Sequence, residues 1–121
     1  MADGLRILIV EELAAAAEFA ARRLVQGGIA CTHLQVASEK DFRAALRRFP
    51  PHLILSDLLL PELNGLTALD IARREFPEVP FVFFSGTSGE EHAIEALRRG
   101  AVDYVLKSNP ARLVQIGRAH V

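Results

Sequence analysis

Residues 53–65 read LILSDLLLPELNG, and the rest of the fold can be built outward from this stretch. It opens with a short apolar run, and such a run without polar alternation is typical of a strand covered on both faces. Pro61 then rigidifies a turn, and Asn64-Gly65 allows the positive φ with which a chain reverses into a helix. The stretch therefore predicts a central strand, a turn that begins at Asp57, and a helix.

Four other runs have similar length and lie at 6–10, 81–84, 102–106 and, with a weaker partial alternation, 31–36. Helical patterns separate them, because apolar residues recur every three or four positions between caps, glycines and prolines. The helices are marked by Leu13, Ala17, Ala20 and Leu24 before Gly27-Gly28; by a Ser38–Asp41 cap before 42–49; by Leu69, Ala72 and Phe76 before Pro77; by 90–99 before Gly100; and by a start at Pro110.

Strands and helices thus alternate along the chain, which predicts an α/β fold of the (βα)5 type with a doubly wound parallel sheet. Right-handed crossovers would place helices on both faces of that sheet. No repeat, linker or low-complexity tract interrupts the pattern, so we expect a single domain over residues 1–121.

Composition excludes several classes of protein. The net charge is -1, so no basic excess favours nucleic acid as a direct partner. Cys31 is the single cysteine, and the four histidines are scattered, so neither a disulfide nor a zinc site is expected. No apolar run reaches the length of a membrane span and no secretory signal opens the chain. We expect a soluble, cytoplasmic protein or fragment.

Five polar side chains follow or end the predicted strands: Glu11, Glu12, Asp57, Ser85 and Lys107. In an open α/β sheet, sites form outside the carboxyl ends of the strands, so these side chains are predicted to meet at one edge. Clustered carboxylates repel one another, and Mg²⁺ would relieve that repulsion. The ammonium and hydroxyl could then hold phosphoryl oxygens while a carboxylate acts as nucleophile. Asp57 is the favoured nucleophile because it ends the central strand.

Four segments carry a family resemblance: ILIVEE (7–12), ILSDLLLPELNG (54–65), FVFFSG (81–86) and GAVDYVLK (100–107). In this order and spacing they resemble the receiver domain of two-component response regulators, over roughly residues 6–113. The resemblance implies a flavodoxin-like sheet with strand order 2-1-3-4-5. It also implies a signalling domain rather than an enzyme, with at most self-catalysed phosphorylation and dephosphorylation.

The resemblance implies a role for each site residue. Asp57 would accept a phosphoryl group from a histidine on a kinase or phosphotransfer protein. Asp57 and Glu12 would bind Mg²⁺ directly, together with the backbone carbonyl of Leu59, and Glu11 would act through a metal-bound water. Lys107 would pair with the phosphoryl group.

The resemblance also implies a switch. Ser85 would move toward a phosphoryl oxygen, and Tyr104 would turn inward as the hydroxyl moves. That movement would change the surface made by helix 90–99, strand 102–106 and the last helix, which could also form a homodimer.

Two features depart from the family pattern, and the tail of the chain is unusual for a separate reason. Glu12 stands where the family has Asp, and its extra methylene could change the metal geometry. Ser108 replaces the proline that usually follows the lysine, which allows a trans peptide bond there. Residues 116–121, IGRAHV, resemble the translation of a sequencing adapter, so this tail could be non-native.

Two other function classes stay open. A pseudo-receiver, which acts as an interaction module without phosphorylation, is compatible with Glu12. An enzyme on a similar sheet fits less well, because a haloacid-dehalogenase-type phosphatase would need an acid where Leu59 stands. A flavodoxin would need a hydroxyl- and glycine-rich loop where residues 11–17 read EELAAAA, and no G-x-G-x-x-G follows any strand.

Overall fold

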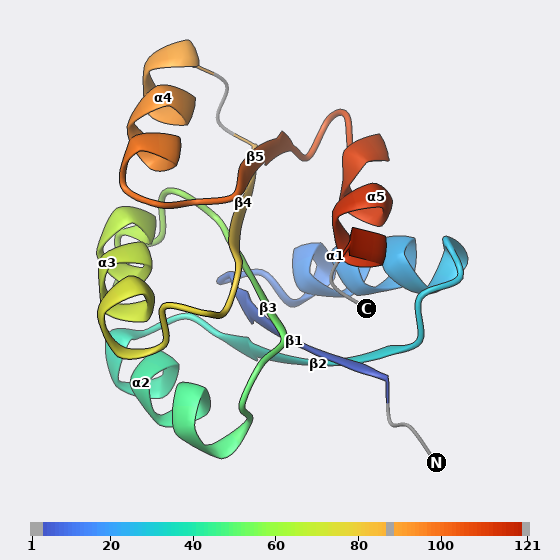
Figure 1. Ribbon diagram of the computed structural model, residues 1–121, viewed down its shortest axis with the longest axis horizontal. Helices are drawn as coiled ribbons and strands as arrows, with labels where there is room; N and C mark the ends of the chain where they lie inside the picture. Colours follow the sequence, from blue (N-terminus) through green and yellow to red (C-terminus); the bar gives the residue numbers. More distant parts are fainter. Residues whose placement is uncertain (1–3, 87–88, 120–121) are drawn as a thin grey trace.

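A computed structural model describes residues 4–86 and 89–119, and Figure 1 shows the arrangement of the chain. Strands and helices alternate in the described ranges as β1 (Leu5–Val10), α1 (Ala14–Gln26), β2 (Cys31–Val36), α2 (Glu39–Arg48), β3 (Leu53–Ser56), α3 (Gly65–Glu75), β4 (Phe81–Ser85), α4 (Glu90–Arg98), β5 (Asp103–Leu106) and α5 (Ala111–Ala119). The strands pair in parallel in the order β2-β1-β3-β4-β5. The predicted fold class and the strand order implied by the resemblance are both confirmed.

The helices cover the two faces of the sheet. Figure 1 shows α2, α3 and α4 on one face and α1 and α5 on the other. Two apolar cores fill the spaces between the layers. Phe42, Leu69 and Phe83 belong to the first, on the side of α2–α4, while Leu24 and Leu113 belong to the second, on the side of α1 and α5.

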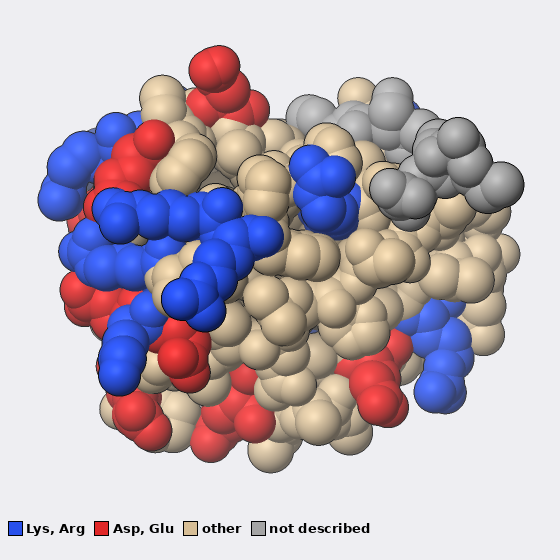
Figure 2. All heavy atoms as spheres, turned by 90° about the horizontal axis from the view of Figure 1, so that it is seen from below, with Lys and Arg blue, Asp and Glu red and all other residues tan. Residues whose placement is uncertain are grey.

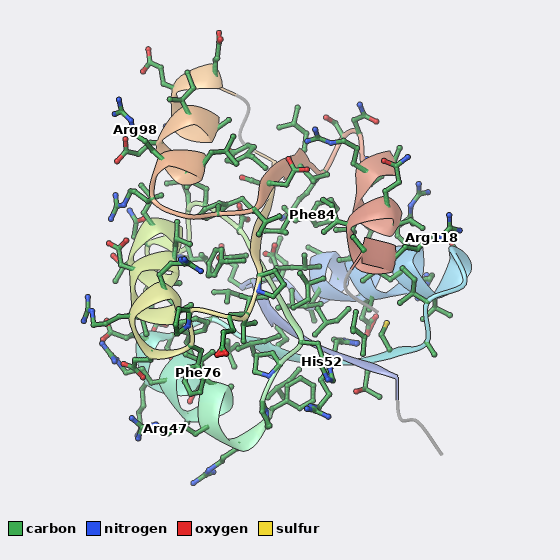
Figure 3. All side chains as sticks on the ribbon, in the orientation of Figure 1. Arg47, His52, Phe76, Phe84, Arg98 and Arg118 are labelled. Carbon is green, nitrogen blue, oxygen red and sulfur yellow. The ribbon has the colours of Figure 1, made fainter. Side chains whose placement is uncertain are left out.

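The central strands are apolar along their length because both of their faces are covered. Every residue of β3 and β4 is buried, whereas β2, at one edge, exposes Thr32, His33 and Leu34. Figure 3 shows the Phe84 side chain of β4 pointing toward α1 and α5, and Arg98 of α4 pointing away from the sheet. The partial alternation of residues 31–36 was therefore the sequence signal of an edge strand.

The helical spacing predicted that Leu13 belongs to the first helix, and this is wrong by one residue. Helix α1 begins at Ala14, and Leu13 is its N-cap residue with a side chain that is 60% exposed. The helix can begin without it because Ala17, Ala20 and Leu24 supply the buried face. Helical spacing alone could not show where the turn between β1 and α1 ends.

The expected positive φ at Asn64-Gly65 is also wrong. Asn64 has φ -69° and caps α3, with its Oδ1 accepting a hydrogen bond of 2.8 Å from the Leu66 N–H. The positive-φ residues of the described ranges are glycines elsewhere, among them Gly100 at φ +109°, directly after α4. The predicted Ser38–Asp41 cap is present, because Ser38 Oγ accepts from the Asp41 N–H at 3.2 Å.

Charged side chains gather on α2 and α3. Figure 2 shows Lys and Arg interleaved with Asp and Glu at one end of the face that it displays. Arg43 bridges the two helices by pairing with Glu39 at 2.9 Å and with Glu75 at 2.6 Å. Because acids and bases alternate, these helices carry local ion pairs rather than a field of one sign. None of the described helices has the length and hydropathy to cross a membrane.

Candidate functional site

The polar residues that end the strands meet at the carboxyl edge of the sheet. Backbone hydrogen bonds between neighbouring strands hold these residues at the same level along the sheet edge. The Asp57 N–H donates to Val10 O at 2.9 Å, and the Lys107 N–H donates to Ser85 O at 2.8 Å. Glu11 follows β1, Asp57 follows β3, and Ser85 ends β4. The structure thus places four of the five predicted side chains within one set of contacts.

Lys107 lies between two carboxylates. Its Nζ is 2.6 Å from Glu11 Oε1 and 3.1 Å from Asp57 Oδ2. Glu11 is 4% exposed, so its charge is compensated in the interior mainly by this ammonium. The second Glu11 oxygen accepts from the Leu13 N–H at 3.1 Å. The shorter contact is therefore with Glu11 and not with the predicted phosphoacceptor.

Both oxygens of the Asp57 carboxylate accept hydrogen bonds. Oδ1 accepts from the Leu58 N–H at 2.8 Å and from Ser85 Oγ at 2.9 Å, while Oδ2 accepts from Lys107. A carboxylate oxygen has two lone-pair sites. Oδ1 accepts two of these bonds and Oδ2 accepts one, so Oδ2 is the more open of the two oxygens to a reacting atom. The Asp57 side chain is only 17% exposed, so a partner must approach from the open edge.

The Lys107 ammonium stays protonated. Burial lowers its pKa, but the hydrogen bonds with Glu11 and Asp57 and the charges of these two carboxylates together outweigh burial, so the pKa lies above the ordinary 10.5. A protonated lysine beside Asp57 can neutralise negative charge that arrives on a phosphoryl group.

Tyr104 points inward beneath α4. It is 8% exposed, and its ring lies 5.8 Å from the ring of Phe83 on the neighbouring strand. Burial raises the pKa of the Tyr104 phenol, the charge of Asp57 adds to that rise, and a side-chain hydrogen bond with Ser85 partly offsets it. The switch pair suggested by the resemblance is therefore in direct contact, with Ser85 bonded to both Asp57 and Tyr104.

Gly65 was predicted as a turn residue, but its role is to let α3 approach Asp57. A Cβ at this position would lie 2.4 Å from the Asp57 carbonyl oxygen and 2.8 Å from the Phe83 ring. The Gly65 N–H donates to Leu58 O at 2.8 Å and closes the turn. A glycine at the first residue of a helix that follows a site carboxylate is the sequence signal that could have indicated this close approach.

The residues expected to bind Mg²⁺ fit that ion by donor type. Glu11, Glu12 and Asp57 against Lys107 leave a net formal charge of two negative, and all the donors are the oxygens that Mg²⁺ prefers. Glu12 is exposed, beside the buried Glu11. Among the described residues, no three acids, histidines or cysteines are close enough to form a ready cage. A shell built largely from carbonyl and water oxygens around one or two carboxylates is what Mg²⁺ usually takes.

A cavity of about 460 Å³ opens between α4 and α5, over β5. Tyr104 and Leu106 form its floor, Ala93 lines the α4 side, and Asn109 and Arg112 line the α5 side. Sequence analysis did not single out Asn109 or Arg112, because a lone polar residue at a helix start carries no motif. The cavity lies on the surface where the resemblance puts the output of the switch.

A family model described as the response regulator receiver domain matches residues 7–118. The nitrogen assimilation regulatory protein NtrX of Azorhizobium caulinodans is 48% identical over 69 residues, which are 54% of this chain and 15% of NtrX. The regulatory protein AtoC of Escherichia coli is 33% identical over 105 residues, which are 84% of this chain and 22% of AtoC. The chain thus spans less than a quarter of these curated relatives.

Solved structures match nearly the whole chain. The receiver domain of NtrX from Brucella abortus superposes with a TM-score of 0.82 at 29% identity, over 94% of this chain and 96% of that one. The BeF3-activated receiver domain of RstA from Klebsiella pneumoniae gives a TM-score of 0.83 at 26% identity, over 95% and 97%.

Proposed function

The chain belongs to the family of response regulator receiver domains, and on that premise we propose that it is a phosphoacceptor of a bacterial two-component phosphorelay. Asp57 accepts the phosphoryl group from a phosphohistidine on a histidine kinase or phosphotransfer protein. The observation that carries the proposal is the Asp57 carboxylate, held by Ser85 on one oxygen and by Lys107 on the other. Asp57, Ser85 and Lys107 come from three different strand ends, and the hydroxyl and the ammonium hold opposite oxygens of the one carboxylate.

In the proposed transfer, Asp57 Oδ2 attacks phosphorus with its remaining lone pair. A P–O bond forms, the P–N bond to the histidine breaks, and the imidazole keeps the electron pair. Catalysis of such a step is mainly positioning and neutralisation of charge. Lys107 supplies positive charge at Oδ2, and the Leu58 N–H fixes the carboxylate plane from the other side.

Asp57 and Glu12 would hold Mg²⁺ together with the Leu59 carbonyl, and Glu11 would contact it through water. When bound, the ion supplies charge neutralisation to the phosphoryl oxygens. The chain's own residues set the approach. Because Glu11 already shares Lys107, the ammonium is oriented before a phosphoryl group arrives.

The switch follows from the bonds of Ser85. A phosphoryl group adds about -1.5 to -2 charge and three strong acceptors, so it competes with Asp57 Oδ1 for the Ser85 hydroxyl. Tyr104, bonded to Ser85, repacks with it and reshapes the α4-β5-α5 surface around the cavity. The change is a shift between two packings rather than a new fold.

The partners follow from this role. The kinase or phosphotransfer protein binds at the open edge of the sheet beside Asp57. The α4-β5-α5 surface binds the output partner or a second copy of the domain. We propose a signalling domain over residues 1–121 that acts in the cytoplasm without contacting nucleic acid or membrane itself. Residues 116–121 remain a proposed non-native tail; 116–119 lie in α5, and 120–121 fall outside the described residues.

A second candidate, the pseudo-receiver, is favoured by two features. Glu12 is longer than the usual aspartate, and Lys107 lies nearer to Glu11 than to Asp57. If this pairing holds Lys107 away from a phosphoryl group, the domain binds partners without being phosphorylated.

The test is labelling with acetyl phosphate in the presence of Mg²⁺, followed by intact-protein mass spectrometry. Wild type should gain the mass of one phosphoryl group, and Asp57→Asn should gain none while keeping the fold, because the two side chains are nearly isosteric. Asp70→Asn, which removes a carboxylate on α3 outside the site, should label as wild type does. Absence of labelling in wild type, with no response to beryllofluoride, would favour the pseudo-receiver.

A further inference from the structure

Side chains hold both polar backbone groups of Tyr104. The Tyr104 N–H donates to Asp103 Oδ1 at 2.7 Å, and the Tyr104 carbonyl accepts from Arg112 Nη2 at 2.7 Å. The same Arg112 nitrogen lies 3.0 Å from Asp103 Oδ1. The two side chains therefore close a ring of contacts around the backbone of this one residue.

The position of β5 explains why such a ring can form. β5 is the last strand of the sheet, so one side of its backbone has no neighbouring strand in the described parts of the chain. An open edge leaves N–H and C=O groups to water or to another chain, and proteins often cover it. Here Arg112, from the first turn of α5, reaches back to that strand. The edge is thereby tied to a helix at the residue that also contacts Ser85.

These contacts extend a continuous path from the phosphoacceptor. Asp57 Oδ1 bonds to Ser85 Oγ, Ser85 bonds to the Tyr104 side chain, and the Tyr104 carbonyl bonds to Arg112. Tyr104 and Arg112 both line the cavity between α4 and α5. A change at Asp57 can therefore reach the cavity wall through Ser85, Tyr104 and Arg112.

We propose that Asp103 and Arg112 form a clamp on the Tyr104 backbone, and that Arg112 is a positioning residue that holds Tyr104 inward and links it to α5. The proposal rests on the function proposed for Asp57. The Arg112 side chain is 56% exposed and that of Asp103 is 27% exposed, so the clamp is weak enough to be reversible. A weak bias is what a switch between two packings needs, since a strong one would lock a single state.

The composition supplies a direct readout. The chain has one tyrosine and no tryptophan, so its fluorescence reports Tyr104 alone. We would measure acrylamide quenching of wild type and Arg112→Gln, with and without beryllofluoride and Mg²⁺. In the unmodified variant the ratio of inward to outward Tyr104 should fall about two- to fivefold, the factor typical of one exposed ion pair, and quenching should rise. Beryllofluoride should bring quenching back toward the wild-type level.

Two further variants separate positioning from general stability. Arg118→Gln removes another α5 arginine that donates to a backbone carbonyl, that of Gly27 at 2.9 Å, and should leave Tyr104 quenching unchanged. Arg118 lies on the α5 end nearest α1 in Figure 3. Arg112→Lys keeps a charge that can pair with Asp103, so it should restore part of the wild-type quenching.

The contrary outcomes are distinct. Equal quenching of Arg112→Gln and wild type in both states would overturn the clamp, and so would a loss of Asp57 labelling in Arg112→Gln, because Arg112 would then act in the chemistry. If Arg112→Gln does not fold, the test becomes hydrogen exchange of the Tyr104 amide in Asp103→Asn. The clamp predicts faster exchange than in wild type, and an unchanged rate contradicts it. Failure of the proposed function would appear instead as unlabelled wild type, and the comparison of unmodified proteins would still test the clamp.

Discussion

Helices α3 and α4 cover the same face of the sheet but are held in different ways. α3 buries Gly65, Ala68, Leu69, Ile71 and Ala72, and the Asn64 side chain caps it. α4 buries only Ala96 and has no side-chain cap, while its Ile94 and Leu97 are about half exposed.

The difference matches the positions of the two helices. α3 follows directly from the turn that carries Asp57, so any movement of its start would displace Asp57. α4 lies over the edge strand β5 and lines the cavity beside Tyr104. Segments with few buried apolar contacts open at lower free energy, and elements that move in signalling come from them. The fold thus fixes the chemical site and leaves the proposed output surface free to repack.

The largest expected difference between α3 and α4 is the loss of stability when one leucine in each helix is truncated. Leu69→Ala in α3 should lower the free energy of unfolding by about 2–5 kcal/mol, because Leu69 is fully buried and a cavity would remain. Leu97→Ala in α4 should change it by less than about 0.5 kcal/mol, since half of that side chain is already in water. Urea unfolding followed by circular dichroism measures both, and equal losses would mean that α4 is as firmly packed as α3.

The next effect concerns the glycines that precede or begin the two helices. Gly65→Ala should destabilise by about 1–3 kcal/mol, because the new methyl group meets the Asp57 carbonyl and the Phe83 ring. It should also slow labelling of Asp57. Gly86→Ala, at the start of the connection to α4, is the matched control, since none of the described residues has an atom within 4 Å of its Cβ position. A Gly65→Ala protein with wild-type stability would show that α3 does not press on the site.

A smaller effect tests the link between the two helices. Arg99, at the end of α4, is bonded to Asp70 of α3, with both side chains partly exposed. Arg99→Gln should cost less than about 1 kcal/mol of global stability. Amide exchange should nevertheless speed up in α4 and stay unchanged in α3, because α4 has few other contacts. Arg98→Gln, whose parent side chain is 75% exposed, provides the control. The same exchange pattern in both variants would show that the Arg99–Asp70 pair does not hold α4 in place.

The smallest effect is a dependence of stability on pH that does not appear near pH 7 and begins only near the Tyr104 pKa. The Tyr104 pKa is raised above the ordinary 10.0, first by burial, so the folded protein binds this proton more tightly than the unfolded chain. The stabilising contribution is complete below pH 10.0 and is lost as the pH rises through the folded pKa. Ultraviolet titration of the single tyrosine should therefore give a midpoint above 10.0 in the native protein and at the ordinary value in denaturant. A native midpoint at or below 10.0 would show that α4 leaves Tyr104 open to water.

Much of the fold could be predicted from the sequence, because its signals are local. An uninterrupted apolar run needs burial on both faces whatever its partners are, and this placed β1, β3 and β4 to within about a residue. Caps and prolines similarly bounded α2 and α3. Strand ends then identified Glu11, Asp57, Ser85 and Lys107, because parallel strands present their carboxyl ends at one edge.

Only the tertiary structure decided which of these groups bind one another. Lys107 pairs more closely with Glu11 than with Asp57, although Glu11 is 96 residues away in the chain. Leu13 lies exposed beside the site, and Arg112 clamps Tyr104 from the next helix. The spacing of apolar residues in the sequence indicates which residues are buried, because burial depends on which face of its own helix or strand a residue occupies. The choice of a partner depends on small differences between contact distances, here 2.6 Å against 3.1 Å, and these distances are set only when the layers pack.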